Sequence, residues 1–404
     1  MAVNLNTPGS LMPIPGVRIG SAAAAVKHTD RLDLAVFTFD EGTDIGGAYT
    51  QSHFAAAPVL LARARNKHAL AWVINSGNAN AATGEPGRRD ADEVCDTVAR
   101  LLQIGPSQVQ PFSTGVIGER LPVERINPAV EKCCQTLSED GWLDAAQAIM
   151  TTDTVPKGLS RQAEIDGGLV TVTGIAKGSG MIKPNMATML AYMATDAKVA
   201  PGVAQMLIDD ALSVSFNRIT VDGDTSTNDC FMLACTSRAE NTTIKDRSNP
   251  AYAELRTLVS EVAGELAQAL VRDGEGATKF VTLKVTGGAT PDDSLAVAYT
   301  VAESPLVKTA LFAGDANWGR FCMAIGRAPI KALDTTGVQL WLDGVQVAKD
   351  GLMAQSYNED AGAAVLAQDE FTVHIDLGRG DAEETIWTTD LSYDYVRINA
   401  EYRT

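Results

Sequence analysis

The stretch Lys177-Gly-Ser-Gly-Met-Ile-Lys-Pro-Asn-Met-Ala-Thr188 carries a hydroxyl residue from a turn-rich segment directly into an apolar run, Met189-Leu-Ala-Tyr-Met193. Its glycines permit tight backbone geometry, and its Pro-Asn pair predicts a turn. Such a setting can strain one peptide bond, so that the Thr188 hydroxyl attacks the carbonyl group before it. Hydrolysis of the resulting ester would leave a chain that begins with Thr188 and has an α-amine.

That α-amine would supply the base that a Thr hydroxyl needs to become a nucleophile. Its ordinary pKa of about 8 leaves a useful fraction unprotonated near neutral pH. No His or Cys is then required, and both are sparse here. The four histidines are His28, His53, His68 and His374, and the six cysteines are Cys95, Cys133, Cys134, Cys230, Cys235 and Cys322. Without CxxC pairs, the spacing predicts buried reduced thiols rather than disulfides or a metal site.

The ordinary alternative is that the glycines form a common loop and that Thr188 only begins a strand. Spacing alone does not decide between this alternative and self-cleavage. The acid- and Asn-rich blocks at 222–229 and 315–320 also leave two interpretations open, a divalent-metal site or a structural loop, of which the loop is favoured.

The Lys177–Thr188 stretch resembles the self-cleavage segment of the ornithine acetyltransferases, also called glutamate N-acetyltransferases, of arginine biosynthesis. Further blocks resemble motifs of that family in the same order along the chain. They are Asn75-Ser-Gly-Asn-Ala-Asn-Ala81, Ser113-Thr-Gly-Val-Ile-Gly118, Thr151-Thr-Asp-Thr154, Asp222-Gly-Asp-Thr-Ser-Thr-Asn-Asp229, Asp315-Ala-Asn-Trp-Gly-Arg320 and Asn399-Ala-Glu-Tyr-Arg-Thr404. The resemblance covers essentially the whole chain.

The resemblance implies autocatalytic cleavage between Ala187 and Thr188. The products would be an α chain, residues 1–187, and a β chain, residues 188–404, which together form one intertwined catalytic unit. Thr188 would then accept the acetyl group of N2-acetylornithine and pass it to glutamate in a ping-pong cycle. The fold implied is α/β, with α-β-β-α layers like those of self-processing aminopeptidases.

The resemblance also assigns roles to residues outside the cleavage segment. Thr114 and Gly115 would form an oxyanion hole, in which the hydroxyl and a backbone N–H donate to the developing negative charge. Lys177 can neutralise an α-carboxylate, and Glu275 can face the distal ammonium that distinguishes ornithine from glutamate. A solvated Gly-Glu-Gly loop is the alternative at Glu275. The implied substrate contacts are Thr151, Lys177, Thr188, Glu275, Asn399 and Thr404.

Apolar periodicity independently predicts a mixed α/β chain. The strands expected are Leu70–Asn75, Leu169–Ile175, Thr188–Met193, Cys230–Cys235 and Phe280–Val285. The helices expected are Asp90–Leu102, Asn127–Thr136, Leu143–Met150, Val203–Val214 and Ala251–Val271. Asp166-Gly167-Gly168 predicts a hairpin within Ala163–Ile175. A domain boundary is guessed near residues 177–188.

Composition limits the partners. A formal charge of −17 argues against nucleic acid and anionic membrane surfaces. Met1 to Val17 shows no secretory leader, and no apolar run approaches the roughly 18–20 residues of a membrane helix, so we expect a cytoplasmic protein. The cycle needs no cofactor, and the resemblance implies a heterotetramer of two α and two β chains.

Several questions stay open at this level. Acetyl-CoA could serve as a second donor, which would make the enzyme bifunctional. A self-cleaving aminopeptidase or amidase would use the same nucleophile but pass its acyl group to water, and a non-catalytic amino-acid-binding protein would stay uncut. Whether the C-terminal residues complete their own site or a neighbour's is also undecided, as are the oligomeric state and any feedback regulation by arginine or ornithine.

Overall fold

The computed structural model describes residues 2–66, 68–183 and 189–401. The chain divides into two compact units, each of which is described by itself. The larger unit comprises Thr7–Asn217 and Asp224–Leu270, and the smaller comprises Met1–Asn6, Arg218–Gly223 and Val271–Thr404. The guess of a boundary near residues 177–188 is wrong, because the strands on either side of that segment pair within one sheet of the larger unit, with Lys177 opposite Leu190.

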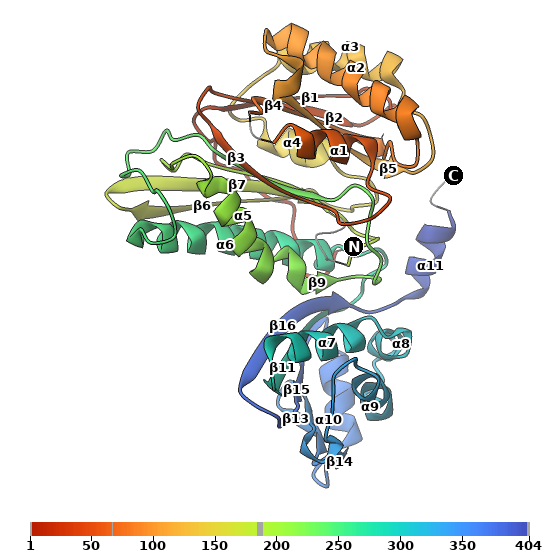
Figure 1. The fold of residues 1–404 in the computed structure, drawn as a ribbon. Helices are drawn as coiled ribbons and strands as arrows, with labels where there is room; N and C mark the ends of the chain where they lie inside the picture. Colours follow the sequence, from red (N-terminus) through yellow and green to blue (C-terminus); the bar gives the residue numbers. More distant parts are fainter. Residues whose placement is uncertain (1, 67, 184–188, 402–404) are drawn as a thin grey trace. The chain divides into compact units, whose positions relative to one another are not determined.

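Two sheets form the centre of the larger unit (Figure 1). The four-stranded sheet has the order β1 (Val17–Ala22), β2 (Leu34–Phe39), β4 (Ala71–Asn78) and β5 (Val109–Val116), and its last two strands are parallel. The five-stranded sheet has the order β3 (Asp44–Tyr49), β10 (Cys230–Cys235), β8 (Leu190–Thr195), β7 (Gly168–Lys177) and β6 (Lys157–Ile165). Strands β8 and β10 are parallel neighbours.

The apolar run of β2 shows why these strands lie between layers. Its residues alternate in direction, so Leu34 and Val36 pack in the cluster beneath the outer helices, while Phe37 packs in the cluster between the two sheets. In that inner cluster Phe37, Trp72 and Tyr192 join the sheets, with ring centroids 5.5–5.9 Å apart. A strand buried on both faces therefore appears in the sequence as a continuous apolar run.

Helices complete the layers of the larger unit (Figure 1). Helices α2 (Gly84–Leu102) and α3 (Val123–Gln135) cover the outer face of the four-stranded sheet, and α1 (Ala57–Ala64) and α4 (Trp142–Ala148) pack against the inner faces. Helices α5 (Val203–Val214) and α6 (Pro250–Arg272) cover the five-stranded sheet. The expected α-β-β-α layering is thus confirmed for this unit.

The smaller unit is built on a seven-stranded sheet of order β14-β13-β12-β15-β11-β16-β9. Phe371, Val373 and Ile375 of β15 pack against its helices. The strands are β9 (Ile219–Thr220), β11 (Phe280–Gly288), β12 (Gln339–Leu342), β13 (Val345–Lys349), β14 (Leu352–Met353), β15 (Glu370–Asp376) and β16 (Ala382–Thr389). The helices are α7 (Pro291–Ala302), α8 (Pro305–Ala313), α9 (Trp318–Gly326), α10 (Glu359–Leu366) and α11 (Tyr393–Ala400). Three short 3₁₀ turns, Pro106–Gln108, Phe216–Arg218 and Thr335–Gly337, complete the elements.

The elements expected from periodicity are all present, with ends shifted by up to six residues, the largest shift being at the start of α2. The run expected to begin at Thr188 is β8, which begins at Leu190, and Thr188 itself lies outside the described residues. The hairpin between β6 and β7 turns at Asp166 and Gly167, both with positive φ, as an Asp-Gly turn requires.

The six cysteines differ in burial. All six cysteines are unpaired; Cys95, Cys133, Cys230 and Cys235 are buried, whereas Cys322 is exposed and Cys134 half-buried, so the prediction of uniformly buried thiols is wrong for these two. Burial raises the pKa of the Cys95 and Cys133 thiols to about 12.

Within the described residues, no helix combines the length and apolarity needed to span a membrane.

Candidate active site

The structure places the expected site residues in two groups. Thr114 and Gly115 lie on β5, Thr151 follows α4, and Lys177 ends β7, all in the larger unit. Glu275 lies in the loop before β11, and Asn399 lies on α11, both in the smaller unit. Ala187, Thr188 and Thr404 lie outside the described residues. Each group is therefore built up separately.

Lys177 and Thr114 are brought together from different sheets. The Lys177 ammonium donates a hydrogen bond of 3.0 Å to the Thr114 hydroxyl oxygen, and both residues are buried. An ammonium group has donors only, so the hydroxyl oxygen must act as the acceptor in this bond. The hydroxyl hydrogen is consequently left to be donated to a different partner. This polarity makes Thr114 a donor, as an oxyanion hole requires.

Gly115 is a glycine for a steric reason. Its φ of +132° lies outside the range that other residues readily adopt, and an added Cβ would come within 2.3 Å of the carbonyl carbon of Gly77. Gly115 pairs with Gly77 in the parallel register of β4 and β5. Two glycines thus let the backbones at the ends of these strands approach one another closely.

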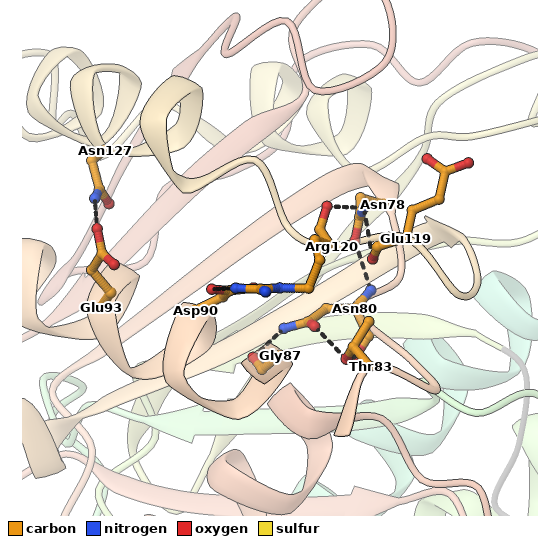
Figure 2. Close-up of polar contacts among 9 residues, drawn as sticks. All are labelled: Asn78, Asn80, Thr83, Gly87, Asp90, Glu93, Glu119, Arg120 and Asn127. Carbon is orange, nitrogen blue, oxygen red and sulfur yellow. Dashed lines mark hydrogen bonds and ion pairs between the residues drawn. The ribbon is translucent and has the colours of Figure 1, made fainter. Parts of the chain in front are cut away.

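Side-chain amides hold the end of strand β5, which carries Thr114. The Ser113 hydroxyl donates to Asn75 Oδ1 over 2.6 Å, and the Asn75 amide donates to the carbonyl of Asn78 over 2.9 Å. The Asn78 amide in turn donates to the carbonyls of Glu119 and Arg120 (Figure 2). The family-like block at 75–81 therefore acts as a clamp on both ends of the 113–120 segment.

The same clamp continues into helix α2. Asn80 donates from its backbone to Asn78 Oδ1 over 2.8 Å, and its amide donates to the Gly87 carbonyl over 2.8 Å (Figure 2). Arg120 makes a two-pronged contact with Asp90, with both nitrogen–oxygen distances 2.6 Å. Helix α2 is thereby joined to the block at 75–81 and to the segment that follows β5.

A fully buried carboxylate, Asp153, joins two of the expected substrate contacts. It accepts from the Lys157 ammonium over 2.7 Å, from the Gly178 backbone over 2.7 Å and from the Thr151 backbone over 2.9 Å. Burial by itself would raise the pKa of Asp153, but the ammonium groups of Lys157 and Lys177 outweigh it and hold that pKa well below its ordinary value. Asp153 thus stays ionised and fixes the chain on both sides of the site.

Asp153 and Lys157 were not anticipated as site residues. Asp153 belongs to the block 151–154, which was a usable signal, but its partners come from β6 and from the segment after β7. Only the folded chain brings those partners together.

In the smaller unit, Glu275 and Asn399 form a pair. The Asn399 amide donates to Glu275 Oε2 over 2.7 Å and to the Tyr395 carbonyl over 3.0 Å. Glu275 is buried, so the solvated-loop alternative is wrong. The neighbouring Gly276 has φ +68°, and a Cβ there would meet the Tyr395 nitrogen at 2.4 Å. The loop therefore packs directly onto the start of α11.

A buried cation supports the same region. The Lys308 ammonium donates to the Thr388 hydroxyl over 3.3 Å and to the Thr389 carbonyl. Burial lowers the pKa of Lys308 to about 8. The adjacent Asp390 accepts from the backbone nitrogens of Thr278 and Lys279, so the end of β16 and the 275–279 loop are tied together.

No group of three or more His, Cys, Asp or Glu side chains gathers as a metal site among the residues that the structure describes. In the block 222–229, Tyr395 donates to Asp222 over 3.2 Å, and Asn228 binds backbone carbonyls. These contacts support the loop interpretation of that block.

Comparison with known proteins gives consistent results. The ArgJ family model matches residues 18–404. The arginine biosynthesis bifunctional protein ArgJ of Pseudomonas syringae pv. tomato is 52% identical over 405 residues, which cover 100% of both chains. Among solved structures, ArgJ from Bacillus halodurans is 35% identical, with a TM-score of 0.49, over 51% of this chain and 95% of that one. An ornithine acetyltransferase from Mycobacterium tuberculosis, complexed with ornithine, is 32% identical, with a TM-score of 0.39, over 45% of this chain and 97% of that one.

Proposed function

Because the chain belongs to the ArgJ family and is an acyltransferase of arginine biosynthesis, we propose that Thr188 carries the acetyl group that this enzyme moves from N-acetylornithine to glutamate. The observation that carries the proposal is the 3.0 Å hydrogen bond from Lys177 to Thr114. It turns the Thr114 hydroxyl into a donor, in the unit that also contains the strand following Thr188.

The first step of the proposal is self-cleavage. The Thr188 hydroxyl attacks the Ala187 carbonyl carbon, and the bond to the Thr188 nitrogen breaks as that nitrogen gains a proton. Water then hydrolyses the ester, leaving a carboxylate on Ala187 and both hydroxyl and α-amine on Thr188. The described residues on either side support this step, since β7 and β8 anchor both ends of the segment in one sheet.

The second step is acetyl transfer. The Thr188 hydroxyl attacks the acetyl carbonyl carbon of N-acetylornithine, and the α-amine accepts the hydroxyl proton and returns it to the departing ornithine nitrogen. Thr114 and the Gly115 N–H donate to the oxyanion. The amine of glutamate then attacks the acetyl ester, which releases N-acetylglutamate and restores Thr188.

The family resemblance assigns substrate contacts in each of the two units. Lys177 and Thr151 are assigned to the α-carboxylate and the acetamide, and Asp153 is well placed to fix both. Glu275, held by Asn399, is assigned to the distal ammonium of ornithine. Thr404 stays a predicted contact, because it lies outside the described residues.

Further parts of the proposal follow from the same family membership. The cycle uses no cofactor, and acetyl-CoA serves as a second donor. The cleaved protein is a cytoplasmic heterotetramer of two α and two β chains.

Mass spectrometry of the denatured protein tests self-cleavage. We expect two chains, residues 1–187 and 188–404. Thr188→Ala should give one folded, uncut and inactive chain, and Thr188→Ser should retain some cleavage because it keeps a hydroxyl. Full transferase activity in the Ala variant, or a single uncut chain in active wild-type material, would contradict the proposal.

The acceptor distinguishes transfer from the hydrolase alternative. With N-acetylornithine as donor, glutamate should accelerate ornithine release, and N-acetylglutamate should appear in equal amount. A rate that is independent of glutamate, with acetate as product, would instead identify an amidase. A non-catalytic binding protein would release no ornithine under either condition.

A further inference from the structure

The proposed catalytic groups are attached to two different sheets. Thr114 and Gly115 lie on β5 of the four-stranded sheet, whereas Thr188 precedes Met189 and β8 of the five-stranded sheet. An oxyanion hole works only if its donors are fixed relative to the nucleophile, since misplacement by about 1 Å can cost roughly 100-fold in rate. A contact between these two sheets at this end is therefore of functional interest.

Asn228 makes a second contact of this kind, in addition to the hydrogen bond from Lys177 to Thr114. It is buried, and its amide nitrogen donates to the Ser113 carbonyl over 2.9 Å and to the Ala79 carbonyl over 2.6 Å. Both partners are carbonyl oxygens, so only the NH₂ group can face them. The Thr227 hydroxyl, 2.6 Å from Asn228 Oδ1, donates to the opposite side of the amide. The two carbonyl acceptors and the hydroxyl donor thus fix the orientation of the Asn228 side chain.

Asn228 is also tied to the strand that follows Thr188. Cys230, two residues further on, donates from its backbone to the Met189 carbonyl over 3.0 Å and begins β10 opposite Leu190. The Asp229 carbonyl accepts from the Thr50 nitrogen over 3.0 Å, which fixes the backbone between Asn228 and Cys230. A short chain of bonds therefore leads from Met189 through Cys230 and Asn228 to Ser113.

We propose that Asn228 is a positioning residue that sets the oxyanion hole relative to the nucleophile by joining the segment before β10 to the end of β5. The Ser113 carbonyl and the Thr114 N–H belong to one planar peptide group. Holding that carbonyl therefore fixes the plane from which Thr114 and Gly115 continue. The inference rests on the proposed function, and it gives a role to the block 222–229.

Asn228→Ala should lower kcat by about 10- to 100-fold with either N-acetylornithine or acetyl-CoA as donor. The KM for glutamate should change much less, because the Asn228 amide binds the protein groups of Ala79, Ser113 and Thr227. Self-cleavage of the precursor should slow as well, since it uses the same nucleophile. Kinetics are measured on material that has been incubated until cleavage is complete.

Asn241→Ala is the matched control. Asn241 is equally buried, and its amide donates to the carbonyls of Lys198 and Thr242, over 3.2 and 2.9 Å, in the same unit. Its loss removes the same kinds of hydrogen bond and should lower the melting temperature by a similar amount. Asn241→Ala should leave kcat and the cleavage rate unchanged, because the partners of Asn241, Lys198 and Thr242, do not belong to β5.

Equal kcat values for the two variants, or wild-type kcat in Asn228→Ala, would overturn the inference. If Asn228→Ala fails to fold, Asn228→Ser takes its place. This variant keeps one donor and should show an intermediate loss of kcat. A wild-type kcat in Asn228→Ser would also overturn the inference. Thr188→Ala separates a failure of the role of Asn228 from a failure of the proposed function. If it is inactive while Asn228→Ala is fully active, only the role of Asn228 fails, and if it is active, the proposed function itself fails.

Discussion

The two groups of site residues are held in different ways. In the larger unit, Thr114 and Lys177 lie on strands inside a four-layered core, next to the fully buried pair of Asp153 and Lys157. In the smaller unit, Glu275 lies on a loop and Asn399 on an eight-residue helix that buries none of its side chains. The first group is fixed by sheet pairing and ion pairing, and the second by single hydrogen bonds.

This difference matches the two tasks of an acetyltransferase. Stabilising an oxyanion requires donors that hardly move, because their value lies in being placed before the reaction. Selecting a distal ammonium requires mainly one carboxylate of the right charge. Substitutions in the larger unit should therefore affect stability and kcat, and substitutions in the smaller unit should affect discrimination between donors.

The largest effect is expected for Asp153→Asn. The substitution leaves the Lys157 ammonium buried without its charged partner, which should lower the free energy of unfolding by about 3–5 kcal/mol at neutral pH. The pKa of Asp153 is lowered by folding, so its contribution is present above pH ~4 and is lost as the pH falls through its lower folded-state pKa. Denaturant titrations in a Thr188→Ala background, at neutral and acidic pH, measure both effects.

Asp33→Asn is the control for that comparison. Asp33 is also buried and accepts from two backbone nitrogens, those of Ala24 and Val26, but burial raises its pKa. Its substitution should cost less, and its pH dependence should have the opposite sign, because wild type gains relative stability as Asp33 is protonated. Identical losses and pH profiles for the two variants would contradict the special role of the Asp153 pair.

Thr114→Ala is expected to be next in size. It removes one oxyanion donor and should lower kcat by about two to three orders of magnitude, with slower self-cleavage. Thr114→Ser keeps the hydroxyl that Lys177 orients and should stay within a few-fold of wild type, as an approximate expectation from the same argument. Unchanged kcat in Thr114→Ala would remove this residue from the site.

A smaller and more selective effect is expected for Glu275→Gln. The amide can still accept from Asn399, but it no longer neutralises the ornithine ammonium, so the KM for N-acetylornithine should rise about tenfold, or roughly 1.4 kcal/mol. The KM for acetyl-CoA should not change, because that donor has no such ammonium. Glu370→Gln, which alters the ion pair with Arg272 in the same unit, is the control. Equal effects on both donors would contradict the division of tasks.

The larger unit was predictable in part: helices α2 to α6 and strands β4, β7, β8 and β10 have clear periods, whereas β1, β2, β3, β5 and α1 were not predicted. The buried run of β10 was identified with its exact bounds, and the layers followed from the family resemblance. The smaller unit was mostly missed, since several of its strands are very short: β9 and β14 have two residues each and β12 has four. Single short alternating runs do not stand out from loops in a sequence.

The site was predictable only in part, and the reason is physical. Thr114, Lys177, Glu275 and Asn399 were named from motifs, and the structure pairs them two by two. Asn228 binds the Ser113 carbonyl and Asp153 binds the Gly178 nitrogen, and both of these partners are far away in the sequence, although Lys157, the charged partner of Asp153, is only four residues away. Nothing in the spacing of residues indicates such contacts before the sheets are assembled.

The central claim, that Thr188 carries the acetyl group, is tested most directly by trapping the intermediate. Cleaved enzyme incubated with N-acetylornithine and no glutamate should gain one acetyl group on the peptide that begins with Thr188. The group should be labile to hydroxylamine, as an ester is, and glutamate should remove it. Parallel double-reciprocal plots should accompany it. Absence of acetyl from that peptide after rapid quenching, together with intersecting plots, would contradict the account and indicate direct transfer between the two bound substrates.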